Sequence, residues 1–165
     1  MTSGWIRGLT SALCLATALT GAACSDDEPT MPSTPSLYDK YGGAPTIRKV
    51  VDDAVTAILA DPVQAPFFAN VGKPGFASAD RIKSCLRLQF TAVFGGPATY
   101  PGRNDMGDMC RDMASSHASL GITGPVFDGF ITDLVAVLKA DGVSDADIAT
   151  VAPALTGLKT SIVTR

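Results

Sequence analysis

Residues 106–127 read MGDMCRDMASSHASLGITGPVF and contain His117, the only histidine of the 165-residue chain. Glycine- and proline-containing stretches at 95–97 and 120–125 bound this region with turns. Soft or apolar side chains at helical spacing predict one face of a short helix here, and they are Met106, Met109, Cys110, Met113 and His117. The imidazole therefore lies on an apolar face.

A lone histidine on an apolar face is either a packing residue or a metal ligand. The sequence has no second histidine, no Cys-x-x-Cys and no His-Glu-x-x-His spacing, which excludes the usual zinc sites built from protein side chains. An ion held by one protein ligand needs a macrocycle to supply the other donors, and in haem proteins a single proximal histidine suffices. We therefore predict that His117 binds the iron of a haem group.

The first 23 residues have the pattern of a secretory signal peptide. A single basic residue precedes an apolar run over 9–19 that is too short to span a membrane, and small residues lead to Cys24. The stretch 19–24, LTGAAC, resembles a bacterial lipobox, whose cysteine is acylated and becomes the mature N-terminus. Gly21 replaces the usual aliphatic residue, so ordinary cleavage near Ala23 stays open as an alternative.

Residues 24–35 are acidic and then rich in Pro, Ser and Thr, which is typical of a solvated tether. With 46% hydrophobic and 18% charged residues, the chain has enough apolar material for the core of one domain. We expect this domain to span residues 36–165. We also expect it to be exported and anchored through lipid on Cys24 to a membrane that faces the periplasm or the cell surface.

Export also determines how the four cysteines are interpreted. Cys14 leaves with the signal peptide and Cys24 carries lipid, so Cys85 and Cys110 remain. An oxidising compartment favours a disulfide between these two, and two separate buried thiols are the alternative. Loss of Arg7 leaves 12 of the 13 basic residues against 16 acidic ones. This balance, without a basic cluster, argues against a nucleic-acid partner.

Apolar periodicity predicts two helices in the first half of the domain. One runs over 45–61 and ends at Pro62, and another begins at a Ser78 cap and stops at Gly95. An irregular connection between them carries two large aromatic side chains in the stretch 66–68. Two such large apolar rings in an irregular segment need an apolar surface to pack against.

Two further helices are predicted in the second half. Thr123 caps the first and Gly142 closes it, and the second spans 144–162 with Pro153 expected to bend or break it. No strand pattern and no internal repeat appears. The predicted fold class is therefore all-α from Ser36 to the C-terminus.

The order of these elements resembles the group I truncated haemoglobins over essentially the whole domain. The matching stretches are Leu37–Gly43, Leu59–Pro62, Pro66–Phe68, Gly95–Pro97 with Tyr100 and Gly102–Arg103, and His117 with Leu120–Thr123 and Phe127. This resemblance implies a two-over-two α-helical sandwich around haem b, with His117 as proximal ligand and Phe68 packed on the porphyrin. We expect a backbone carbonyl one turn back to accept a hydrogen bond from Nδ1 of this histidine.

The chain also departs from that family. Members commonly have Phe-Tyr where this chain has Ala54-Val55, and that tyrosine hydrogen-bonds the bound ligand, which valine cannot do. A common distal glutamine corresponds to Leu86, and Ile82 occupies the position that faces the sixth coordination site. The region 100–117 is longer than usual and contains Cys110.

These considerations predict a set of residues in contact with haem: Val55, Phe67, Phe68, Ile82, Leu86, Phe90, Tyr100, Met113, Ile122 and Phe127. One basic residue is expected to pair with a haem propionate, and the candidates are Arg81, Lys83, Arg103 and Arg111.

An apolar distal side favours reversible binding of diatomic gases (O2, NO, CO) over tight oxygen storage, because a missing hydrogen bond costs about 1 to 3 kcal/mol of ligand retention. Ligand binding is thus favoured over catalysis. Two alternatives stay open. One is a haem enzyme such as a nitric oxide dioxygenase, or an electron-transfer haem protein, with a redox partner, and the other is a haem-free helical interaction module.

Overall fold

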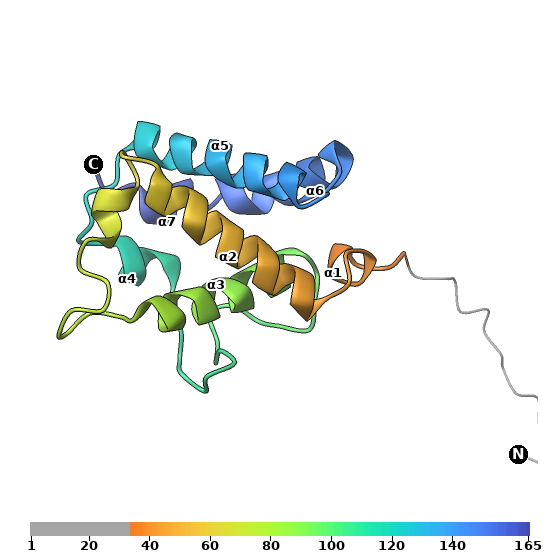
Figure 1. The fold of residues 1–165 in the computed structure, drawn as a ribbon, viewed down its shortest axis with the longest axis horizontal. Helices are drawn as coiled ribbons and strands as arrows, with labels where there is room; N and C mark the ends of the chain where they lie inside the picture. Colours follow the sequence, from red (N-terminus) through yellow and green to blue (C-terminus); the bar gives the residue numbers. More distant parts are fainter. Residues whose placement is uncertain (1–33) are drawn as a thin grey trace, which may run out of the picture. The chain divides into compact units, whose positions relative to one another are not determined.

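The computed structural model describes residues 34–165, so the predicted signal peptide, the lipidation site Cys24 and nearly all of the predicted linker lie outside the described residues. The elements are α1 Leu37–Lys40, α2 Ala44–Ala60, the 3₁₀ helix η1 Ala65–Phe68, α3 Ala79–Val93, α4 Met113–His117, α5 Gly124–Ala140, α6 Asp145–Thr156 and α7 Lys159–Ile162 (Figure 1). Residues 34–165 form no strand, only an isolated bridge between Arg103 and Met109. The predicted all-α class is confirmed.

The long helices form two layers. Helix α2 packs against both α3 and α5, α6 packs against α5 and α3, and the short α4 contacts α7 (Figure 1). None of the helices in the described part of the chain is long and apolar enough to cross a membrane. The core between the layers consists of Ile47, Val50, Val51, Ala54, Phe90, Phe94, Leu134, Leu138, Val143, Ile148, Val151 and Leu155.

The predicted ends of the long helices agree with the structure. The Ser78 hydroxyl accepts a hydrogen bond from Arg81 N at the start of α3, and Ser144 accepts one from Asp147 N at the start of α6. Thr123 is the N-cap residue of α5, but its side chain makes no capping hydrogen bond. Beyond Pro153, α6 continues only to Thr156, and α7 follows as a separate helix.

The predicted helix face from Met106 to His117 is wrong in its first half. Helix α4 begins only at Met113, after Asp112 caps it, and the Met106 and Met109 side chains are exposed. Asn104 explains the difference, because its side-chain oxygen accepts hydrogen bonds from the backbone of Met106 and Asp108 and closes a turn there. Only the last turn of the predicted helix forms.

A polar cluster joins the N-terminal helix to α6. The Asp147 carboxylate accepts hydrogen bonds from Lys40 Nζ (2.7 Å), Ser144 Oγ (2.6 Å) and the Tyr41 hydroxyl. The Tyr41 hydroxyl also accepts from Ser144 N at 3.0 Å. The pKa of Asp147 is lowered to about 2. The largest cause is the hydrogen bond from Lys40, followed by those from Ser144 and Tyr41.

This lowered pKa predicts an acid-dependent loss of stability. The folded pKa of Asp147 lies below its ordinary value of 3.8, so the contribution of the carboxylate is complete above that value and is lost as the pH falls toward 2. The free energy of unfolding of wild type minus that of Asp147→Asn should therefore be largest above pH 4 and shrink toward pH 2. Urea unfolding at each pH measures it. Asp145→Asn, which removes a pair with exposed Lys139, is the control. A wild-type minus Asp147→Asn difference that is constant from pH 2 to 6 would contradict the assignment.

Candidate functional site

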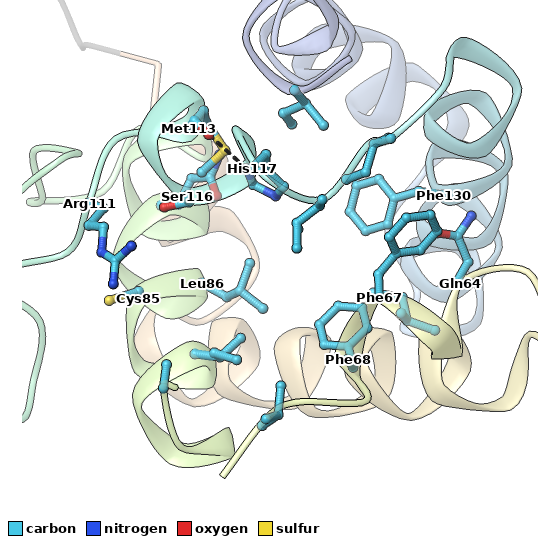
Figure 2. Close-up of a pocket in the computed structure, with 18 of the residues that line it drawn as sticks. Gln64, Phe67, Phe68, Cys85, Leu86, Arg111, Met113, Ser116, His117 and Phe130 are labelled. Carbon is cyan, nitrogen blue, oxygen red and sulfur yellow. Dashed lines mark hydrogen bonds between the residues drawn. The ribbon is translucent and has the colours of Figure 1, made fainter. Parts of the chain in front are cut away.

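A cavity of about 460 Å³ lies within the helices, and its walls are mainly aliphatic and aromatic (Figure 2). Helices α2 to α7 and η1 all contribute side chains to it. The volume falls in the range of sites for a small molecule or cofactor. Ten of the eleven residues predicted to contact or bind haem line this cavity: Phe67, Phe68, Ile82, Leu86, Phe90, Tyr100, Met113, His117, Ile122 and Phe127.

His117 is at the C-terminal end of α4, and its imidazole is directed into the cavity (Figure 2). Its Nδ1 lies 2.8 Å from the backbone oxygen of Met113, one helical turn back. A carbonyl oxygen can only accept a hydrogen bond, so Nδ1 carries the proton and Nε2 of the neutral ring keeps its lone pair. The expected hydrogen bond to a carbonyl one turn back is present, and it leaves Nε2 as the nitrogen available to a ligand.

The aromatic side of the cavity comes from the segment after α2. Helix α2 ends at its C-cap Asp61, and Pro66 is at the first turn of η1, which carries Phe67 and Phe68. Both rings face the cavity (Figure 2), and this accounts for two large apolar side chains in a segment that the sequence predicted to be irregular. Phe127 of α5 is buried, and Phe67 packs against the cluster that contains it.

Val55 does not line the main cavity, in contrast to the other residues predicted to contact haem. Val51, Ala54 and Ile58 of α2 line that cavity, and Val55 lines a smaller neighbouring one of about 180 Å³. Residue 55 lies about 40° around the helix from residue 51 but about 100° from residue 54, so its side chain is at the edge of the face shared by 51, 54 and 58. Phe68, Val71 and Ile82 line both cavities.

Two glutamines in the cavity wall were missed by the sequence analysis. Gln64 is 5% exposed, and its Nε2 donates to the Val126 carbonyl at 2.8 Å. Gln89 is 6% exposed, and its Nε2 lies 3.8 Å from Met113 Sδ on α4. The seven-residue spacing from Ile82 to Gln89 could have placed this amide on the same face of α3. Its contact with α4 assigns it to the His117 side of the cavity.

Two of the four basic residues that were candidates for the propionate partner, Arg81 and Arg111, line the cavity. The other two do not: Lys83 pairs with Asp52 at 2.8 Å, and Arg103 donates to the Gly107 carbonyl at 2.8 Å. The structure thus reduces the candidates from four to two.

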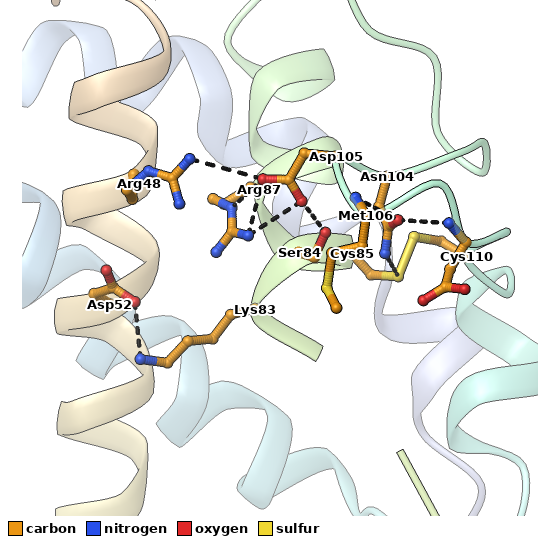
Figure 3. A network of polar contacts seen from close by, with 11 residues as sticks. Arg48, Asp52, Lys83, Ser84, Cys85, Arg87, Asn104, Asp105, Met106 and Cys110 are labelled. Atoms are coloured by element: carbon orange, nitrogen blue, oxygen red, sulfur yellow. Dashed lines mark hydrogen bonds and ion pairs between the residues drawn. A yellow bond between two sulfur atoms is a disulfide. The ribbon is translucent and has the colours of Figure 1, made fainter. Parts of the chain in front are cut away.

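The long loop between α3 and α4 is attached to α3 by several polar contacts (Figure 3). The Asp105 carboxylate accepts hydrogen bonds from Ser84 and Arg87, and the Ser84 hydrogen bond in particular holds the pKa of Asp105 below its ordinary value. Asn104 Nδ2 lies 3.6 Å from Cys85 Sγ. The structure also joins Cys85 to Cys110 through a disulfide, with Cα atoms 5.6 Å apart. The loop that leads to His117 is therefore fixed to the opposite wall of the cavity.

The donor set of the cavity fits a cofactor that brings most of its own ligands. Residues 34–165 contain no cluster of three or more His, Cys, Asp or Glu side chains able to hold a bare metal ion. One imidazole nitrogen in an apolar cavity matches the requirement of haem for a single axial side chain and a dry pocket.

The sequence matches a family model described as bacterial-like globin over residues 36–164. The chain belongs to this globin family. It is similar to the group 1 truncated haemoglobin of Nostoc commune, with 31% identity over 132 residues that cover 79% of this chain and 98% of that protein. The group 1 truncated haemoglobin of Synechocystis is 32% identical over 117 residues, which are 71% of this chain and 86% of that protein.

Solved structures of truncated haemoglobins have a fold similar to that of this chain. The truncated haemoglobin of Tetrahymena pyriformis in its Fe(III) form has a TM-score of 0.65 and 25% identity, and the match covers 79% of this chain and all (100%) of that one. The 2/2 haemoglobin of Synechococcus, in the cyanomet state and with covalently attached haem, has the same TM-score of 0.65 with 26% identity over 79% of this chain and 100% of that one. The truncated globin fold is confirmed. Membership of the globin family implies that this chain binds haem and diatomic gas ligands.

Proposed function

We propose that this globin holds haem b through Nε2 of His117 and binds O2, NO and CO reversibly on the opposite, apolar side of the porphyrin. The observation that supports it most strongly is the His117 imidazole itself. Its Nδ1 is committed to the Met113 carbonyl, and its other nitrogen faces a cavity of cofactor size. Bound haem would supply the iron that takes the gas molecule.

The protein's own part is to orient the imidazole and to keep water out. The hydrogen bond to the Met113 carbonyl fixes the tautomer and the ring plane of His117. The Asp112 carboxylate accepts a hydrogen bond from Ser115 N and so caps the short helix that carries Met113 and His117. Phe67 and Phe68 would cover the porphyrin from the η1 side. In the neutral imidazole with its proton on Nδ1, the Nε2 lone pair is free to act as a ligand.

The side chains expected on the distal side offer no hydrogen-bond donor. Ala54 of α2 and Ile82 and Leu86 of α3 are apolar, and the Gln89 amide lies toward α4. Without a donor from these three positions, oxygen should leave quickly, whereas CO, which depends less on a hydrogen bond, should stay well bound. A dioxygenase would need a polar distal group for proton delivery, and these three positions provide none.

A haem-free interaction module is disfavoured by the cavity. Protein interiors are close-packed, and a helical domain that had lost its cofactor would be expected to fill such a space with larger side chains. The retained imidazole, with its second nitrogen directed into this space, has no packing purpose there.

Export and lipid attachment at Cys24 form part of the proposal. They rest on the signal-peptide pattern of the first 23 residues and the lipobox-like stretch that ends at Cys24. An oxidising compartment would keep the Cys85–Cys110 disulfide formed. In that setting, the globin would bind gases or pass electrons to a partner at a membrane surface.

The role of His117 can be tested by chemical rescue. His117→Gly should lose stoichiometric haem or show a spectrum without histidine ligation, and added imidazole should restore the five-coordinate ferrous spectrum because it refills the space of the side chain. Absorption spectra of both forms measure this. Ser116→Ala, at the adjacent residue lining the cavity, is the matched control and should keep the wild-type spectrum. An unchanged ferrous spectrum in His117→Gly without imidazole would rule out the assignment.

The apolar distal side predicts the effect of a new donor. Leu86→Gln should place an amide donor at the wall of the main cavity and slow oxygen dissociation about tenfold if the new hydrogen bond contributes roughly 1.4 kcal/mol. Stopped-flow oxygen dissociation measures the change, and Leu86→Met, which keeps a side chain of similar length without the donor, separates packing from hydrogen bonding. Equal rates in the Gln and Met variants would refute the predicted effect.

A further inference from the structure

Two arginines line the cavity, and the structure gives them different surroundings. Arg81 Nη2 donates to the Met109 carbonyl at 2.7 Å, and its Nε lies 3.4 Å from Asp108. The Arg111 guanidinium makes no hydrogen bond or ion pair with any other residue in the range 34–165, and Figure 2 shows it beside Cys85 at the edge of the cavity. Arg111 therefore has an exposed cationic group still available to an anion.

The neighbouring acid is not the partner of this guanidinium. The Asp112 carboxylate accepts hydrogen bonds from Ser115 N and Ser115 Oγ, both at 2.8 Å, and so caps α4. These hydrogen bonds, the first from the backbone, also lower the pKa of Asp112. The Asp112 carboxylate is thus bonded to α4 and not to the Arg111 guanidinium.

The backbone at Arg111 is fixed on both sides. Cys110 is 4% exposed, its N–H donates to the Gly102 carbonyl at 2.9 Å, and its sulfur is joined to Cys85 of α3 (Figure 3). The Tyr100 hydroxyl donates to the Arg111 carbonyl at 2.7 Å. The backbone at this position is thus already ordered before an anion binds, and only the side chain of Arg111 still loses conformational entropy on binding.

We propose that Arg111 pairs with a propionate carboxylate of the bound haem and that the Cys85–Cys110 disulfide positions it to do so. The proposal rests on haem binding, because haem b carries two carboxylates that stay at the open side of an apolar pocket. A planar guanidinium matches a carboxylate with two parallel hydrogen bonds. Arg111 is thus an anchor of the cofactor, and the disulfide is a positioning element that acts through it.

Haem release to excess apomyoglobin tests the first half of this proposal. The full-length chain, exported and purified in mild detergent without reductant, is loaded with ferric haem. Arg111→Gln should release haem about fivefold faster than wild type, near the upper end for a partly exposed ion pair, and Arg111→Lys should fall between the two. Arg103→Gln, in the same loop but outside the cavity, is the control and should match wild type.

Haem dimethyl ester provides a second measurement, because its propionates carry no charge. With this cofactor, wild type and Arg111→Gln should release haem at the same rate. A fivefold difference that persists with the ester would show that Arg111 acts by packing and would overturn the pairing. So would equal rates with ordinary haem.

A double-mutant cycle tests the role of the disulfide. Peptide mapping without reductant should first find Cys85 linked to Cys110 in the wild type, and finding both as free thiols would overturn the disulfide's role. In the Cys85→Ser/Cys110→Ser background, the effect of Arg111→Gln should fall below twofold, because the guanidinium is no longer held at the propionate. An effect that stays fivefold there would show that Arg111 needs no disulfide.

The outcome also separates this inference from haem binding itself. If the wild-type chain retains no stoichiometric haem, or retains it without any dependence on His117, haem binding through this histidine fails and the pairing fails with it. If haem is retained through His117 while release is insensitive to Arg111, only the anchor is refuted. Circular dichroism of each variant confirms that the helices remain folded.

Discussion

The hydrogen bond between His117 Nδ1 and the Met113 carbonyl connects the fold of this globin to its chemistry. It fixes which ring nitrogen carries the proton, and it does so within a helix of one and a half turns, Met113–His117. Such a short helix is marginal by itself, so its position must come from its surroundings. Asp112 caps it, α7 packs against it, and the preceding loop is attached to α3.

That loop is attached to the opposite wall of the cavity at two places. Asp105 and Asn104 hold its first part to α3 through Ser84, Arg87 and Cys85, and the disulfide holds its end one residue before Arg111. The two walls of the cavity are thereby joined by side-chain contacts and by a covalent bond. Helix α3 and the approach to α4 are therefore constrained together, although the loop between them has no regular secondary structure.

Much of the fold could be predicted from the sequence, because the long helices have clear apolar periods and clear end signals. The α2 face of Ile47, Val51 and Ile58 and the caps Ser78 and Ser144 are local properties of the chain. The start of α4 was mispredicted because the Asn104 side chain closes a turn that competes with the helix. Apolar periodicity carries no information about that hydrogen bond.

The site was predictable in type but less so in detail. A lone histidine and two unexplained phenylalanines indicated a haem pocket. Which of the adjacent residues Ala54 and Val55 lines the main cavity depends on how α2 is rotated about its axis, and the sequence does not give that rotation. The choice between Arg81 and Arg111 depended on long-range contacts, with Met109 and Asp108 for Arg81 and with Tyr100 and Cys85–Cys110 for the Arg111 segment. Such contacts follow from the packed loop and not from spacing in the sequence.

The central claim is that His117 is the axial ligand, and its being the only histidine among 165 residues permits a direct measurement. Resonance Raman spectroscopy of the untagged ferrous protein should show an iron–histidine stretching band. Uniform ¹⁵N-histidine labelling changes the mass of this one side chain alone, so the account predicts that the band moves to lower frequency in the labelled protein. A ferrous haem protein whose iron–ligand band is absent, or is unmoved by the label, would contradict the account.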